Sequence, residues 1–116
     1  MPYEAAVELL ISHRWWLVRD DFGVYVEPCY GFHGESMAAI DWRAAWAALE
    51  NGYLPCSGGE REVLRVAASI AEGVPIDLRE VVACLDVVDS GRVALAVLTA
   101  GGHRQAAAAV AGVLSR

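Results

Sequence analysis

Lysine is absent from the 116 residues of this chain, and all nine basic side chains are arginines. This absence excludes a phosphate-binding Walker A lysine, a Schiff-base lysine and a lysine general base. Cysteine is sparse: Cys29, Cys56 and Cys84 are odd in number, lie far apart and form no CxxC pair. That pattern predicts reduced thiols in a cytoplasmic protein rather than a disulfide framework.

Long hydrophobic runs are also missing. No stretch reaches the roughly 18 to 20 apolar residues that span a bilayer, and Glu4 and Glu8 stand where a signal peptide would be basic. The apolar content is nevertheless 56 %, which excludes disorder and allows a core of useful size. We therefore expect one soluble domain over residues 1–116, cytoplasmic and not bound to a membrane.

Positive charge is scarce in the first half of the chain. Residues 1–56 hold eight acidic side chains and three arginines, whereas residues 57–116 hold seven and six, for a net charge of −6. A phosphate backbone needs clustered cations, so nucleic acid is not the expected partner. The acidic half is compatible with a basic protein partner or with solubility alone.

Two helices in tandem are predicted after residue 56. Ser57 and Glu60 fit a capping box that opens the first helix, and Gly73 fits its left-handed end. Asp77 and Glu80 repeat the pattern in acidic form for the second helix. Apolar stripes at helical spacing follow each cap: Val63, Val66, Ala67 and Ile70, then Leu78, Val81, Val82 and Leu85. Both stripes predict buried helix faces.

The first half combines helix and strand patterns. We expect a helix over residues 3–13, a hairpin of strands 15–19 and 24–26 around a turn at 20–23, a loop over 29–36 and a short third strand over 37–40. Asp41 caps a helix over 42–51, Asp89 or Ser90 caps one over 92–100, and a last helix covers 104–114. The predicted fold class is α+β, with a small antiparallel sheet of two or three strands near the N-terminus, four to six flanking helices and an all-helical second half.

The predicted hairpin carries apolar side chains on both faces. Neighbouring strand residues point to opposite faces, so Trp15 and Trp16 cannot meet the same core. The pattern predicts an interaction surface at Trp15, Trp16, Val18 and Tyr25, for self-association or for a protein partner. Alternatively, the helices over 3–13 and 42–51 cover both faces. The predicted core contains Leu9, Leu17, Val26, Trp46, Leu49, Leu64, Ile70, Leu78, Val82, Leu85, Val97 and Leu98.

Two further patterns suggest chemistry. Cys29 lies four residues before His33, with Glu35 close by, which is the outline of a thiolate–imidazole pair or of half a metal site. A loop cysteine beside a solvent-facing histidine gives the same outline. Residues 61–86 have the outline of a helix-turn-helix, but the second helix carries three acidic residues against one arginine, which disfavours contact with DNA.

Two stretches resemble known families. Residues 56–60, Cys-Ser-Gly-Gly-Glu, resemble the Ser-Gly-Gly signature of ABC ATPases, but the chain has no P-loop and the capping box already accounts for Ser57 and Glu60. Residues 60–61, 64–71, 74–78 and 85–86 resemble a recurring pattern in small uncharacterised proteins of actinobacteria and their phages. The abundant alanine and missing lysine fit a GC-rich genome of that kind. This resemblance implies no activity for a particular residue.

The sequence contains no coherent catalytic set. We therefore expect a non-enzymatic protein–protein interaction or regulatory protein, with no cofactor or metal, and a phage-encoded protein acting on a host protein is one form of this hypothesis. One alternative is a small cysteine-dependent hydrolase or redox enzyme that uses Cys29 or Cys56. Another is a helix-turn-helix-like nucleic-acid binder.

Overall fold

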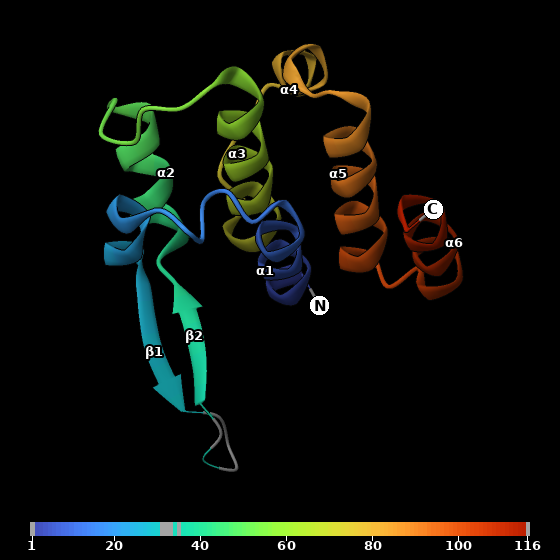
Figure 1. Ribbon diagram of the computed structural model, residues 1–116, viewed down its shortest axis with the longest axis horizontal. Helices are drawn as coiled ribbons and strands as arrows, with labels where there is room; N and C mark the ends of the chain where they lie inside the picture. Colours follow the sequence, from blue (N-terminus) through green and yellow to red (C-terminus); the bar gives the residue numbers. More distant parts are fainter. Residues whose placement is uncertain (1, 31–33, 35, 116) are drawn as a thin grey trace.

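The computed structural model describes residues 2–30, 34 and 36–115, and for residues 28–30 and 36–38 it describes the backbone alone. The elements in chain order are α1 (Pro2–His13), the 3-10 helix η1 (Asp20–Tyr25), β1 (Val26–Tyr30), β2 (Ser36–Ile40), α2 (Trp42–Glu50), α3 (Gly58–Glu72), α4 (Leu78–Cys84), α5 (Val87–Ala100) and α6 (Arg104–Leu114) (Figure 1). The fold is α+β, as predicted, with its small antiparallel sheet near the N-terminus.

The strands β1 and β2 form an antiparallel hairpin that extends away from the helices (Figure 1). Its register pairs Val26 with Ile40 and Tyr30 with Ser36. The strand predicted over 37–40 is confirmed as the partner of β1. The loop predicted over 29–36 is partly wrong, because residues 29 and 30 belong to β1 and residue 36 belongs to β2. Residues 31–33 and 35 of that loop lie outside the described residues.

The strand predicted over residues 15–19 is wrong, and most of its partner over 24–26 is wrong as well. Residues 15–18 form a turn after Arg14, whose φ is 68°, and residues 20–25 form η1. Aromatic and β-branched residues favour strands mainly because they pack well on a pleated surface. Here the turn instead places the Trp16 indole in the core, where it is fully buried.

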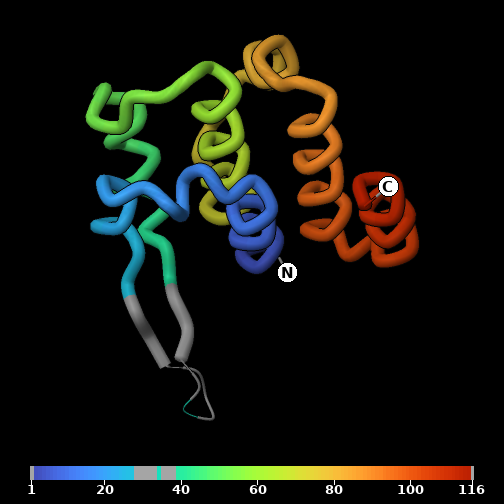
Figure 2. Tube along the Cα trace, viewed as in Figure 1, coloured from blue at the N-terminus to red at the C-terminus, as the bar shows by residue number. Residues whose placement is uncertain are grey.

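The helices pack around α3. α1 packs against α3 and α5, α2 packs against α3, and α6 packs against α5. In Figure 2, residues 14–25 leave the end of α1 and run toward α2. Their 3-10 helix, η1, packs against α2. Since α1 comes from the start of the sequence and contacts two helices from its second half, both halves contribute to one core.

The caps of α3 are those that the sequence predicts. Ser57 Oγ accepts the N–H of Glu60, and the Glu60 carboxylate accepts the N–H of Ser57 at 2.8 Å. Gly73 ends the helix in the left-handed conformation, with φ of 70°. This region of the chain therefore folds as its local sequence dictates.

Aspartates cap three further helices. Asp41 accepts the N–H of Ala44 at the start of α2, and Asp77 accepts that of Arg79 at the start of α4, both at predicted caps. Helix α5 differs from the prediction, because Asp86 is its N-cap and accepts the N–H of Asp89 at 2.7 Å. The predicted caps Asp89 and Ser90 therefore lie inside the helix, which starts five residues earlier than expected.

The core confirms some of the predicted members and contradicts others. Leu9, Leu49 and Leu64 are buried, and Val26, Trp46, Ile70, Leu85 and Leu98 are half-buried. Leu17, Leu78, Val82 and Val97 are exposed, so these four predictions are wrong. Of the seven residues of α4, all of them described, Val81 alone is buried, because this short helix packs chiefly on α3.

Candidate functional site

The turn after α1 is fixed to the helices by its second tryptophan. Trp16 is fully buried, and its Nε1 donates to the main-chain oxygen of Glu60 at 2.8 Å. Trp15 is half-buried and meets Trp16 edge to face, with ring centroids 4.9 Å apart. The expectation that Trp16 lies on an open face is therefore wrong, because the strand that would have turned it outward does not form.

Arg19 braces the same turn. Its guanidinium carbon lies 4.5 Å from the Trp15 ring centroid and 4.9 Å from that of Trp16. Two of its nitrogens donate to the Asp21 carboxylate, and Nη1 donates to the main-chain oxygen of Pro55 at 2.6 Å. The hydrogen bonds between them raise the pKa of Arg19 and lower the pKa of Asp21. The segment is thereby tied to the loop that follows α2.

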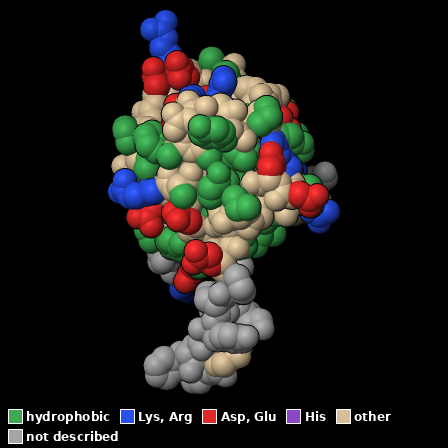
Figure 3. Space-filling model, turned by 90° about the vertical axis from the view of Figure 1, so that its left-hand side faces the viewer, with side chains coloured by type: hydrophobic (Ala, Val, Ile, Leu, Met, Phe, Trp, Pro, Cys, Tyr) green, Lys and Arg blue, Asp and Glu red, His purple; other side chains and the backbone are tan. Residues whose placement is uncertain are grey.

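Four apolar side chains near this brace are exposed, and we call them the η1 surface: Leu17, Val18, Val24 and Tyr53. Val18 is 76 % exposed, and Val24 and Tyr53 are each 74 % exposed. Figure 3 shows the side of the molecule on which η1 and α2 lie in Figure 1, where hydrophobic side chains are interspersed with acidic and arginine side chains. Val18 is the predicted interaction residue that belongs to this surface. Tyr25 is half-buried instead and packs on Phe22, with ring centroids 5.9 Å apart.

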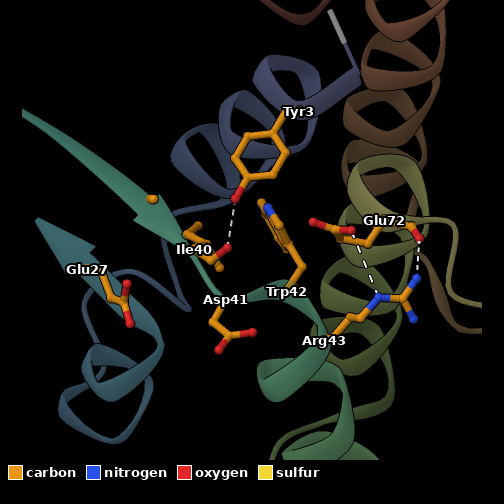
Figure 4. A pocket seen from close by; sticks show the side chains of 8 residues that line it. Tyr3, Glu27, Ile40, Asp41, Trp42, Arg43 and Glu72 are labelled. Carbon is orange, nitrogen blue, oxygen red and sulfur yellow. Dashed lines mark hydrogen bonds and ion pairs between the residues drawn. The ribbon is translucent and has the colours of Figure 1, made fainter. Parts of the chain in front are cut away.

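A cavity of about 310 Å³ opens where the hairpin meets the helices (Figure 4). The Tyr3 hydroxyl on its wall donates to the main-chain oxygen of Ile40 at 2.8 Å, and the Tyr3 ring meets the Trp42 ring at 84°. Arg43 Nη2 donates to the main-chain oxygen of Glu72 at 2.9 Å, and Arg43 Nε lies 3.9 Å from the Glu72 carboxylate. The wall thus combines two aromatic rings with charged groups.

The Trp42 indole is the unusual member of this wall. It is 1 % exposed, yet its Nε1 has no hydrogen-bond partner among the described residues. The carboxylates of Glu27 and Asp41 also line the cavity. Sequence reasoning missed this site because its residues come from α1, the hairpin, α2 and α3, and only the tertiary fold brings them together.

A separate cluster of charges joins α2, α3 and α4. Glu62 is 1 % exposed, and Arg65 Nη1 donates to it at 2.6 Å. Arg65 also donates twice to Glu50, and its Nη1 lies 3.6 Å from Glu80. The hydrogen bonds that Arg65 donates to Glu50 are the main reason why the pKa of Arg65 is raised. These charges satisfy one another, so the cluster has a structural role.

The cysteines do not assemble an activated thiol in the described residues. Cys56 is half-buried, and burial raises the pKa of its thiol above the ordinary value of 9.0, although Arg61 opposes the shift. A nucleophilic thiolate needs the opposite shift. Cys84 is exposed. The side chain of Cys29 lies outside what the structure describes, as do His33 and Glu35, and the described residues hold no group of three or more His, Cys, Asp and Glu suited to a metal ion.

Comparison with protein-family models, with curated proteins and with solved structures finds no match for this chain. In the part of the chain that the structure describes, no helix has both the length and the apolar character needed to cross a membrane. The η1 surface and the cavity at the base of the hairpin are the features of this chain that bear on its function.

Proposed function

We propose that the chain is a non-enzymatic interaction or regulatory protein that binds a protein partner through the η1 surface. One observation carries this proposal: Val18 and Val24 are about three-quarters exposed on the segment that Trp16 and Arg19 anchor, and Tyr53 is equally exposed in the loop to which Arg19 donates. Apolar and aromatic side chains exposed together are typical of protein interfaces. Val18 is also one of the residues at which the sequence predicts an interaction.

The segment beneath the η1 surface is held in place before any partner arrives. Trp16 anchors it to α3, and Arg19 links it to Asp21 and Pro55. A surface that is already ordered loses little conformational entropy on binding. This order supports a role in recognition for the exposed side chains.

The partner that we propose is a basic protein. The η1 surface belongs to residues 1–56, which hold eight acidic residues against three arginines. Two of these arginines, Arg19 and Arg43, are already paired with Asp21 and Glu72. Opposite charge on the partner would speed encounter, whereas a second copy of this chain would bring the same negative excess to the contact. We therefore favour a different protein over a homodimer.

The proposed setting is the cytoplasm, where the free thiols of Cys56 and Cys84 stay reduced. The resemblance of the second half adds an actinobacterial or phage origin, with a host protein as the target. Burial raises the pKa of the Cys56 thiol, which disfavours a cysteine-dependent activity at that residue, whereas the side chain of Cys29 lies outside what the structure describes.

The proposal is tested by capture from an actinobacterial lysate with three immobilised forms of the chain. These are the wild type, the double variant Val18→Ser/Val24→Ser, and the control Val113→Ser, which changes a valine 61 % exposed on α6. We expect a protein of pI above about 8 that the wild type and the control retain, that the double variant loses, and that moderate salt elutes.

Light scattering of the same three proteins separates the alternatives. A wild-type dimer that the double variant converts to a folded monomer would assign the η1 surface to a second copy and overturn the proposed partner. Equal retention of every captured protein by all three forms, or capture of acidic proteins alone, would also overturn it.

A further inference from the structure

The cavity at the base of the hairpin contains a buried donor that lacks an acceptor. Trp42 is 1 % exposed, and its Nε1 has no partner among the described residues. Figure 4 shows this nitrogen at the end of the ring nearest Tyr3, with the Glu72 carboxylate on the same side of the cavity. An indole N–H can only donate, and burying it unpaired is unfavourable. The site therefore favours an occupant that offers a hydrogen-bond acceptor.

The charges around the cavity favour an occupant that is also a cation. Among the described residues that line the cavity, Glu27, Asp41 and Glu72 contribute three carboxylates against the single guanidinium of Arg43, which is already held by Glu72. Asp41 uses one oxygen, Oδ1, to cap α2 through Ala44, and its other oxygen forms no hydrogen bond with the residues that the structure describes. The rings of Tyr3 and Trp42 can add cation–π attraction.

We propose that this cavity binds a basic residue of a peptide, most favourably arginine. Its guanidinium lies against the Glu27 and Asp41 carboxylates, and its main-chain carbonyl accepts from Trp42 Nε1. A volume of about 310 Å³ suits a single long side chain with its own peptide group. Arginine is favoured over lysine because its planar group donates to more than one carboxylate and stacks on aromatic rings. The site shares no residue with the η1 surface, and the inference does not depend on the function proposed for that surface.

The test is an NMR titration that observes the indole N–H signals. The probe is N-acetyl-L-arginine N-methylamide, which carries the cation and the peptide carbonyls but no carboxylate. It is added to about 20 mM, because a single-residue ligand is expected to bind in the millimolar range. We expect the Trp42 indole signal to move downfield as its N–H gains an acceptor, while the Trp16 signal, already bonded to Glu60, stays in place.

Two chemical controls separate the sources of affinity. The citrulline analogue keeps the shape and the carbonyls but lacks the charge, and we expect its affinity to be lower by about tenfold, the loss of one charge-assisted hydrogen bond. Free L-arginine tests whether the natural ligand is a peptide residue or a free amino acid. If free arginine bound more tightly than the amide, with the same shift at Trp42, the ligand would be an amino acid and the peptide proposal would be overturned.

Matched variants locate the site. Asp41→Asn keeps a residue that can cap α2 but removes its charge, and Glu27→Gln removes the second carboxylate; each should weaken binding several-fold. Asp77→Asn makes the same change at the N-cap of α4 and should leave binding unchanged. Trp42→Phe lacks one indole N–H and therefore assigns the Trp42 signal. If Trp42→Phe does not fold, the binding losses in Asp41→Asn and Glu27→Gln still test the site. An unmoved Trp42 signal, equal affinity for the citrulline analogue, or equal losses in Asp41→Asn and Asp77→Asn would overturn the proposal.

Discussion

Trp16 Nε1 and the main-chain oxygen of Glu60 form a hydrogen bond of 2.8 Å that joins positions 44 residues apart. Glu60 is also the capping-box residue at the start of α3, so the same turn of helix receives both a local and a long-range contact. The bond fixes the turn after α1 against α3. It thereby positions Arg19 and the η1 surface.

Replacing Trp16 with phenylalanine should destabilise the protein by about 1 to 3 kcal/mol. The smaller ring removes the hydrogen bond to Glu60 and leaves unfilled space in the core. Urea denaturation measures the change as a lower midpoint. The control is Trp15→Phe, at a half-buried position, which should cost less than half as much. Equal losses for the two tryptophans would contradict the role assigned to this bond.

Removing the cap of α3 should have a smaller and more local effect. Ser57→Ala should cost about 1 kcal/mol, the usual loss at an N-cap. Ser90 is an exposed serine inside α5 with no capping role, so Ser90→Ala should stay within about 0.5 kcal/mol. Thermal unfolding of both variants gives the comparison.

Magnesium ATP should leave the melting temperature of the wild type unchanged, and an increase would revive the nucleotide-binding interpretation of residues 56–60.

The sequence predicts best those elements whose signals are local. The capping box of α3 needs only a serine and a glutamate three residues apart, and Ser57 and Glu60 form it as predicted. Helix α6 has the predicted bounds because Gly101 and Gly102 break the chain directly before it. The short apolar run over 37–40 correctly predicts a strand, whereas the pattern predicts its neighbouring strands over 15–19 and 24–26 and the structure has the partner at Val26–Tyr30.

The sequence predicts less well where tertiary packing decides between two local options. Residues 15–19 have strand composition, yet burial of Trp16 outweighs that preference. The apolar stripe of α4 is wider than its contact with α3, which buries Val81 and leaves Leu78 and Val82 exposed. The cavity lined by Tyr3 and Trp42 has no sequence signature, because its members span 70 residues of chain.

The buried and the exposed apolar positions of α4 should respond differently to substitution. Val81 is 1 % exposed, so Val81→Ala should cost about 1 to 3 kcal/mol through lost burial and an unfilled cavity. Leu78 and Val82 are 65 % and 63 % exposed, and Ala at either position should stay within about 0.5 kcal/mol. Chemical denaturation of the three variants measures this. A large loss at Leu78 would show that this face is buried in solution, for example by self-association, which a dependence on protein concentration would reveal.

The buried carboxylate of Glu62 should make Arg65 sensitive to replacement. Arg65→Met leaves Glu62 without its closest cation, and breaking a buried ion pair in this way typically costs about 3 to 5 kcal/mol. Arg61 Nε lies 3.6 Å from the same carboxylate, so the loss should fall at the lower end of that range. The exposed Arg79 provides the control Arg79→Met, with an expected change near zero. The double variant Glu62→Gln/Arg65→Met should recover part of the loss, and its failure to do so would indicate that packing of the arginine stem, not charge, is responsible.

Cys56 should react slowly with iodoacetamide at neutral pH. Burial raises the pKa of its thiol above 9.0, so the thiolate fraction in the folded protein is smaller than in the unfolded chain. The sign follows by linkage: the contribution of this group to stability is complete below the unfolded pKa and is lost as the pH rises through the folded pKa. Mass spectrometry of each site should show Cys84, which is exposed, alkylated before Cys56, with the rate at Cys56 increasing steeply above pH 9 and on unfolding in urea. Rapid alkylation of Cys56 in the folded protein near pH 6 would mean a stabilised thiolate and would favour the alternative function, a cysteine-dependent enzyme, over the interaction protein.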